Sequence, residues 1–332
     1  MRAMVMTGIG DADVLQPEDV DKPAIQGDHD VLVHVMAAGV NPIDTKLRGR
    51  GAYGDRKYPA VLGCDGSGIV EAVGESVTGL APGDEVYYCY GGIGITPGNY
   101  AEYNVVPDHA VAKKPESLGF AEAAAAPLVL ITAWEALFDR ADMTEEKRVL
   151  IHAGAGGVGH VAVQLAAIAG ASVATTVSTE EKAALVRRLG AERVIRYREE
   201  RVADAVLAWT EGQGADIALD TVGGDTFIDT IPAMAFYGDL VTILQVPETT
   251  DWQTARLRNL RISQELMLSP MLFGLAEGIA HQGKILAECA GYIDAGRLTI
   301  HLSERLPLEK AARAHRLIEA GGMTGKVTLE IE

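Results

Sequence analysis

The sequence predicts an α/β protein of two domains, one mainly β and one a doubly wound α/β domain with a parallel sheet. The chain has 332 residues, more than a single hydrophobic core usually organises. Up to about residue 125, short β-branched runs are separated by Gly, Pro, Asp and Asn, whereas strands and helices alternate regularly from Arg148 onward. This change of pattern predicts the two domains.

The N-terminal part is expected to form a small, barrel-like β domain. Apolar runs at 31–36, 68–74 and 84–88 are separated by turn signals such as Ala81-Pro82-Gly83-Asp84. The glycine-rich stretch 91–98 is expected to be a loop, because its glycines and its proline disfavour a helix.

The middle of the chain predicts a parallel sheet covered by helices, because consecutive parallel strands need right-handed crossover connections. The expected strands are 148–152, 172–177, 193–197, 216–220 and 239–244, and the expected helices are 158–169, 180–189, 201–210 and 227–233. After about residue 270 the pattern is less regular. There we expect helices at 274–295 and 308–320, and strands at 298–302 and 326–331.

Composition argues against several classes of protein. With 46 acidic and 29 basic residues the formal charge is −17, so we expect no nucleic-acid binding through a broad basic face. Apolar runs are far shorter than the about 18 residues of a membrane helix, and we expect neither membrane insertion nor a signal peptide. The cysteines Cys64, Cys89 and Cys289 are scattered, which disfavours a disulfide framework or a thiolate-rich zinc site and indicates a reducing, cytoplasmic location.

The strongest functional signal is a glycine-rich turn. Gly154, Gly156 and Gly159 fit the pattern GxGxxG, which follows an apolar strand and opens an amphipathic helix through Gly157 and Val158. We expect Gly154 to permit the tight turn, Gly156 to let the backbone approach a pyrophosphate, and Gly159 to let the helix pack closely on the strand. The helix N-terminus would then bind the phosphates. The alternative is a βα turn that binds nothing.

The end of the second strand of this domain predicts NADPH rather than NADH. An NAD site usually places Asp or Glu there to accept from the ribose 2′-OH, but the strand ends in Val177-Ser178. Ser178, Lys182 and Tyr197 are therefore candidate contacts of a 2′-phosphate, with Arg198 beside them. Glu180 and Glu181 argue the other way, although acids are common at helix starts. The alternative for Lys182 is an ordinary solvated lysine.

Several segments together resemble the medium-chain dehydrogenase/reductase superfamily, in its zinc-free quinone oxidoreductase (zeta-crystallin-like) branch. The matching segments are 37–44, 63–70, 73–74, 82–86, 124–127, 132–134, 152–159, 189–191 and 220–224. The resemblance implies a GroES-like catalytic domain formed by 1–126 and 271–332, with a Rossmann NADP-binding domain at 127–270 inserted into it. It also implies an active site in the cleft and a homodimer, commonly formed through edge strands of the Rossmann sheets.

The resemblance is to the zinc-free branch because this sequence has other residues where zinc alcohol dehydrogenases have their zinc ligands. In those enzymes a cysteine ligand follows the Ala-Gly-Val-like strand, but residues 41–44 contain none. Gly63-Cys64-Asp65 replaces their Gly-His-Glu motif, and no cysteine stands near Pro127. A catalytic zinc needs three converging protein ligands, so we expect no metal site. The alternative for Cys64 is a small buried residue, which is the usual environment of a free cysteine.

The resemblance also suggests catalytic residues. Asn41 and Tyr53 are candidate donors to a substrate carbonyl oxygen, and Lys46 stands where the family often has a tyrosine, which leaves the proton donor open. The alternatives are that Asn41 only forms the turn before Pro42 and that Tyr53 packs as a loop aromatic.

Three further candidates concern the nicotinamide. Thr132 and Val222 match cofactor-contacting segments of the family, and Gln245 follows a strand whose carboxyl end is expected to line the crevice. The expected activity is NADPH-dependent hydride transfer to a quinone or an α,β-unsaturated carbonyl. The alternatives are a zinc-dependent alcohol dehydrogenase and a non-catalytic, NADPH-binding structural protein.

Overall fold

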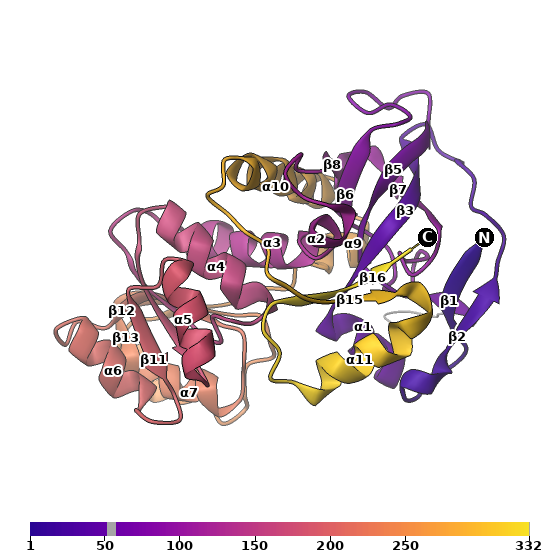
Figure 1. Cartoon of the computed structure of the whole chain (residues 1–332). Helices are drawn as coiled ribbons and strands as arrows, with labels where there is room; N and C mark the ends of the chain where they lie inside the picture. Colours follow the sequence, from indigo (N-terminus) through magenta and orange to yellow (C-terminus); the bar gives the residue numbers. More distant parts are fainter. Residues whose placement is uncertain (52–57, 332) are drawn as a thin grey trace. The chain divides into compact units, whose positions relative to one another are not determined.

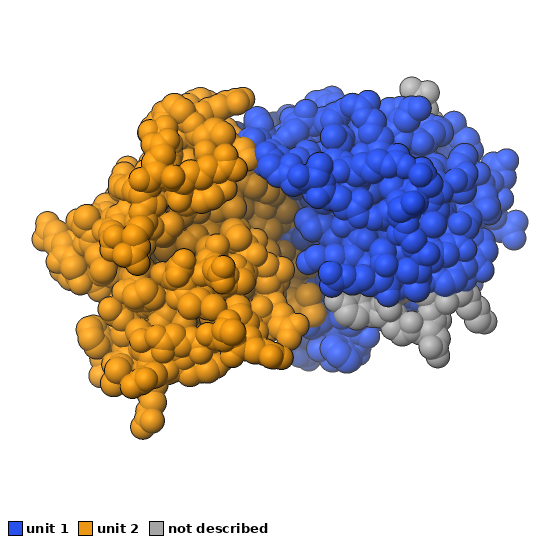
Figure 2. Space-filling model, turned by 90° about the horizontal axis from the view of Figure 1, so that it is seen from below, with its two compact units in different colours: residues 1–128, 268–332 blue, residues 129–267 orange. Residues whose placement is uncertain are grey.

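The computed structural model describes residues 1–51 and 58–331 of the chain. The chain divides into two units (Figure 2). Unit 1 consists of residues 1–128 and 268–332, and unit 2 of residues 129–267, so that unit 2 is an insertion in the sequence of unit 1.

Unit 1 is built on a seven-stranded sheet with the order β15-β16-β3-β5-β6-β8, in which β7 also pairs with β3 (Figure 1). A smaller sheet has the order β2-β1-β4. Buried valines of β3, β5, β6 and β7 pack together, as the β-branched runs predicted. The strands are β1 (Arg2–Met6), β2 (Leu15–Asp19), β3 (Asp30–Val40), β4 (Ala60–Val61), β5 (Asp65–Val73), β6 (Glu85–Cys89), β7 (Tyr103–Pro107), β8 (Val111–Lys113), β15 (Leu302–Pro307) and β16 (Lys326–Glu330).

The helices of unit 1 come from both of its chain segments. They are α1 (Pro42–Arg50), α2 (Phe120–Ala124), α9 (Ser269–Phe273), α10 (Ala276–Asp294) and α11 (Ala311–Ala320). Pro42 occupies the first turn of α1, where its missing N–H has no cost, and so fixes where the helix begins. The stretch 91–98 contains no helix or strand, as expected.

The expected strand at 298–302 is wrong. β15 begins at Leu302, where pairing with Lys326 of β16 starts. Leu298 is instead buried in the turn that ends α10, where its N–H donates to the Tyr292 carbonyl. The apolar residue that suggested a strand therefore packs against the end of a helix.

Unit 2 contains a six-stranded parallel sheet with the order β11-β10-β9-β12-β13-β14. The strands are β9 (Arg148–Ile151), β10 (Ser172–Val177), β11 (Arg193–Arg196), β12 (Ala215–Asp220), β13 (Met234–Thr242) and β14 (Arg261–Gln264). The helices are α3 (Pro127–Trp134), which continues as a π-helical turn, α4 (Gly157–Ile168), α5 (Glu180–Arg188), α6 (Val202–Trp209), α7 (Asp225–Thr230) and α8 (Trp252–Leu257). The strand order reverses beside β9, where doubly wound sheets bind their ligands.

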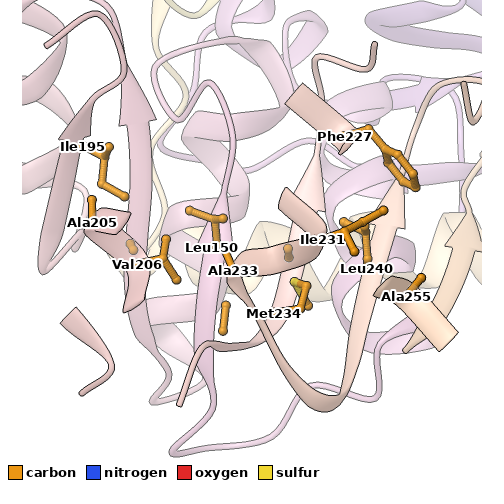
Figure 3. Packing of buried hydrophobic residues seen from close by; sticks show 13 residues of the cluster. Leu150, Ile195, Ala205, Val206, Phe227, Ile231, Ala233, Met234, Leu240 and Ala255 are labelled. Carbon is orange, nitrogen blue, oxygen red and sulfur yellow. The ribbon is translucent and has the colours of Figure 1, made fainter. Parts of the chain in front are cut away.

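One hydrophobic cluster of unit 2 joins the sheet to its helices. Leu150 of β9, Ile195 of β11 and Leu240 of β13 are fully buried, and Val206 of α6 and Phe227 of α7 pack with them (Figure 3). This packing explains why the periodic sequence of the segment predicted the βα units well.

Two strands of unit 2 differ from the expectation. β14 was not predicted, because Ile262 is its single aliphatic residue and the strand lies at the edge of the sheet. β13 begins at Met234 instead of 239, because Met234 already pairs with Ala215 of β12. The register shifts before Asp239, where Tyr237 interrupts the extended backbone with a left-handed φ of 62°. In the described part of the chain, no helix is long and apolar enough to cross a membrane.

Candidate functional site

The glycine-rich turn joins β9 to α4, and its glycines are required by close contacts. A Cβ atom on Gly154 would lie 2.0 Å from Oγ1 of Thr175 in β10. A Cβ atom on Gly159 would lie 2.2 Å from the Ala153 carbonyl oxygen. The residue of the turn in the left-handed region is Ala153, with φ 51°. Gly154 is needed because strand β10 passes so close.

The N-terminus of α4 suits an anionic group. Gly156 is the N-cap, Gly157 begins the helix and Val158 follows, so no side chain caps the first N–H groups. The first turn also contains no acidic residue. The N–H groups without a side-chain cap and the helix dipole therefore favour a phosphate at this position. The turn fits the pyrophosphate of a dinucleotide.

The structure brings the predicted 2′-phosphate residues together at the carboxyl ends of β10 and β11. Val177 pairs with Arg196, and the Tyr197 N–H donates to the Val177 carbonyl at 3.3 Å, so Ser178 and Tyr197 follow adjacent strand ends. Thr179 caps α5 by accepting from the Lys182 N–H, which places Lys182 in its first turn.

Of the two acids that argued for NADH, Glu180 is engaged with cations. Glu180 lies 2.7 Å from Arg187 and 3.7 Å from Arg196. The hydrogen bond from Arg187 lowers the pKa of Glu180. Arg196 was not among the predicted site residues. Its place at the end of β11, the third strand of unit 2, could have indicated that it lies near the 2′-phosphate residues.

Asp220 organises the carboxyl ends of β12 and β13. Its buried carboxylate accepts from the N–H groups of Val222 and Gly223 at 2.9 and 2.8 Å, and from the Thr242 hydroxyl at 2.8 Å. These bonds hold the two loops that carry Val222 and Gln245, both of which are exposed. Asp220 was not predicted as a site residue. It could have been found from the sequence, because it begins the Asp-Thr-Val-Gly-Gly segment that resembles the family.

In unit 1, a buried polar cluster forms where β3, β5 and β16 meet. Asn41 Nδ2 donates to Asp65 Oδ2 at 2.8 Å, and its Oδ1 accepts from the Lys326 ammonium. Lys326 Nζ lies 3.7 Å from Asp65 Oδ2, and Asn41 N–H donates to Asp44 at 2.8 Å. All four side chains are buried. Asn41 is thus the N-cap of α1, the structural alternative considered for it, and its part in catalysis stays a prediction.

Burial governs the ionisation of this cluster. It raises the pKa of Asp44 to about 7 and lowers the pKa of Lys326. It also raises the pKa of the Cys64 thiol, whose Sγ lies 3.8 Å from Asp44, so a thiolate is disfavoured there. Among residues 1–51 and 58–331, no group of three or more His, Cys, Asp or Glu could hold a metal ion. With an ammonium beside Asp65, these residues do not suit zinc.

The other predicted residues are in separate environments. Lys46 is exposed on α1, and Thr132 is buried in α3. Tyr53 lies outside the described residues.

The sequence is similar to known proteins over nearly its whole length. The alcohol dehydrogenase GroES-like domain family matches residues 27–116, and the zinc-binding dehydrogenase family matches residues 189–329. A quinone oxidoreductase of Pseudomonas aeruginosa is 33% identical over 320 residues, which are 96% of each chain. A zinc-type alcohol dehydrogenase-like protein of Staphylococcus aureus is also 33% identical over 320 residues, 93% of each chain.

Among the similar solved structures are two complexes with NADPH. A mycobacterial protein in complex with NADPH has 32% sequence identity and a TM-score of 0.86, and the match covers 99% of this chain and 100% of that one. The quinone oxidoreductase of Escherichia coli in complex with NADPH has 26% identity and a TM-score of 0.86, with the same coverage.

Proposed function

Because this chain belongs to the medium-chain dehydrogenase/reductase superfamily, we propose that it is a zinc-independent NADPH-dependent reductase of quinones or α,β-unsaturated carbonyls. The observation that carries this proposal is the uncapped N-terminus of α4 at the glycine turn, next to strand ends that lack a free ribose acid. The NADPH complexes of two relatives support the choice of cofactor.

The residues of unit 2 would hold the cofactor along the carboxyl ends of the strands. Gly156 and Gly157 receive the pyrophosphate, while Ser178, Lys182 and Tyr197 receive the 2′-phosphate. Thr132, Val222 and Gln245 are proposed contacts of the nicotinamide half. When bound, NADPH supplies the hydride, and the protein's task is to orient it and to exclude competing reactions.

A substrate that accepts a hydride develops negative charge on its oxygen, which the protein must stabilise. We assign this task to hydrogen-bond donors, for which Asn41, Lys46 and Tyr53 are the candidates. Quinones and enones are already electron-poor and need less Lewis-acid assistance than a simple ketone. The ammonium of Lys326 beside Asp65 supports a site that works without zinc.

The cofactor preference can be tested at Lys182. We expect Lys182→Ala to lose preference for NADPH while NADH activity is retained, because the substitution removes a positive charge from the 2′-phosphate pocket. The measurement is kcat/KM with each cofactor. Lys284→Ala, an exposed lysine of α10, is the matched control and is expected to leave the ratio unchanged. An unchanged ratio for Lys182→Ala would reject its phosphate role.

The reaction can be tested by following NADPH oxidation at 340 nm with 1,4-benzoquinone, 9,10-phenanthrenequinone and 2-alkenals. We expect turnover with at least one of them. Tight NADPH binding without turnover across the panel would favour the non-catalytic alternative. Metal analysis tests the alcohol dehydrogenase alternative, which requires about one tightly bound zinc per chain, whereas we expect far less.

We further propose a cytoplasmic homodimer. Within the part of the chain that the structure describes, the edge strand β14 pairs with β13 alone, and Trp252 and Leu257 of the adjoining α8 are exposed. Edge-to-edge pairing of two sheets would cover such a strand. Light scattering at several concentrations measures the mass.

A further inference from the structure

His152 is the residue between β9 and the glycine turn, and its ring connects two other elements of unit 2. It is 2% exposed. Its Nε2 lies 2.8 Å from the hydroxyl oxygen of Thr230, at the end of α7. Its Nδ1 lies 3.4 Å from the hydroxyl oxygen of Thr176 in β10. The ring therefore has a contact on each side.

The contacts select one tautomer of the ring. The Thr230 hydroxyl donates to the Thr226 carbonyl at 2.6 Å, so it can only accept from His152, and the proton is on Nε2. Nδ1 is then an acceptor for the Thr176 hydroxyl. Burial lowers the pKa of His152 to about 4, so that the ring is neutral at pH 7.

The Thr176 hydroxyl in turn supports the glycine turn. With its hydrogen directed at Nδ1, its oxygen accepts from the Ala153 N–H at 2.9 Å, and the Thr176 carbonyl accepts from Gly154 N–H at 3.1 Å. Ala153 is left-handed, a conformation that is unfavourable for a residue with a Cβ atom. Such a residue persists only where neighbouring bonds hold it.

We propose that His152 is a positioning residue of the cofactor site, which orients the Thr176 hydroxyl and thereby holds Ala153 and the turn that receives the pyrophosphate. This inference rests on the proposed NADPH function. His152 does not contact the cofactor in this assignment, and its effect reaches the phosphates through Thr176 and Ala153. At metal sites, removing a group that orients a ligating residue lowers affinity by about tenfold or more, and we expect an effect of that order here.

The test compares two ligands by calorimetry. We expect His152→Phe to raise the Kd of NADPH about tenfold, whereas the Kd of 2′-AMP, which lacks the pyrophosphate, should change less than about twofold. Thr176→Val should show the same selective loss. His152→Asn places an acceptor oxygen near the position of Nδ1 and should recover most of the NADPH affinity.

The control is His315→Phe in unit 1, which removes another buried, neutral histidine, one whose pKa is lowered to about 3 by burial and the Arg48 charge. It should leave both Kd values unchanged. Equal weakening of NADPH and 2′-AMP, or a lower melting temperature with unchanged Kd values, would show that His152 only stabilises the fold and would overturn the inference. If the unaltered protein binds neither NADPH nor NADH, the proposed function itself fails, and the inference fails with it.

Discussion

Replacing Gly159 by alanine is expected to abolish tight NADPH binding, with a Kd raised about 100-fold or more. The added Cβ would lie 2.2 Å from the Ala153 carbonyl oxygen and 2.8 Å from the Gly154 Cα. Both neighbours are backbone atoms of the turn itself, so α4 must move away from β9 or the turn must open. Either change displaces the N–H groups that receive the pyrophosphate. Overpacking of this kind also costs about 1–3 kcal/mol of stability.

The control for Gly159→Ala is Gly291→Ala, a glycine inside α10 whose added Cβ would meet nothing within 4 Å. That variant should bind NADPH normally and be slightly more stable, by about 0.5–1 kcal/mol, because alanine is the better helix former. Titration of NADPH fluorescence gives the Kd, and urea unfolding gives the stability. Near-normal NADPH affinity in Gly159→Ala would mean that the turn does not carry the phosphates.

The second large effect is expected from Lys326→Met, which should destabilise unit 1 by about 3–5 kcal/mol. Lys326 is buried 3.7 Å from the Asp65 carboxylate and also donates to Asn41. Removing one partner of a buried ion pair leaves the other charge without compensation, which is more costly than removing both. Urea unfolding followed by circular dichroism measures the loss.

Two further variants show whether the charge is responsible. The double variant Lys326→Met with Asp65→Asn removes both charges and should recover part of the lost stability. Lys284→Met removes an exposed lysine and should change stability by less than about 0.5 kcal/mol. A double variant as unstable as Lys326→Met would assign the loss to packing instead of charge.

The regular elements of unit 2 were predictable because their signals are local. The strand expected at 172–177 is β10, and the helix expected at 180–189 ends only one residue earlier. Each has a continuous apolar pattern and a polar boundary, such as the Thr179 cap. β14 lacked such a pattern, since it is held by pairing with β13 at the sheet edge.

In the candidate site, too, features with local sequence signals were predictable and features that depend on distant residues were not. The glycine motif was recognised from spacing within one turn, and the ends of β10 and β11 were correctly expected to be neighbours. The roles within the turn were not predictable, because the crowding of Gly154 comes from Thr175 on another strand. Lys326 was overlooked for a similar reason, since it is 285 residues from Asn41 in the chain.

By itself, the sequence determined the fold class, the family, the glycine turn and the lack of a ribose acid at the end of β10. Each of these depends on residue types at short spacings, which the chain carries whatever surrounds it. The tertiary structure alone decided that Ala153 is the left-handed residue, that Asp220 accepts from the loop after β12, and that an ammonium meets Asp65. It also decided that the His152 ring contacts Thr176 and Thr230. These features depend on strand pairing between distant segments, and burial then determines which groups carry charge.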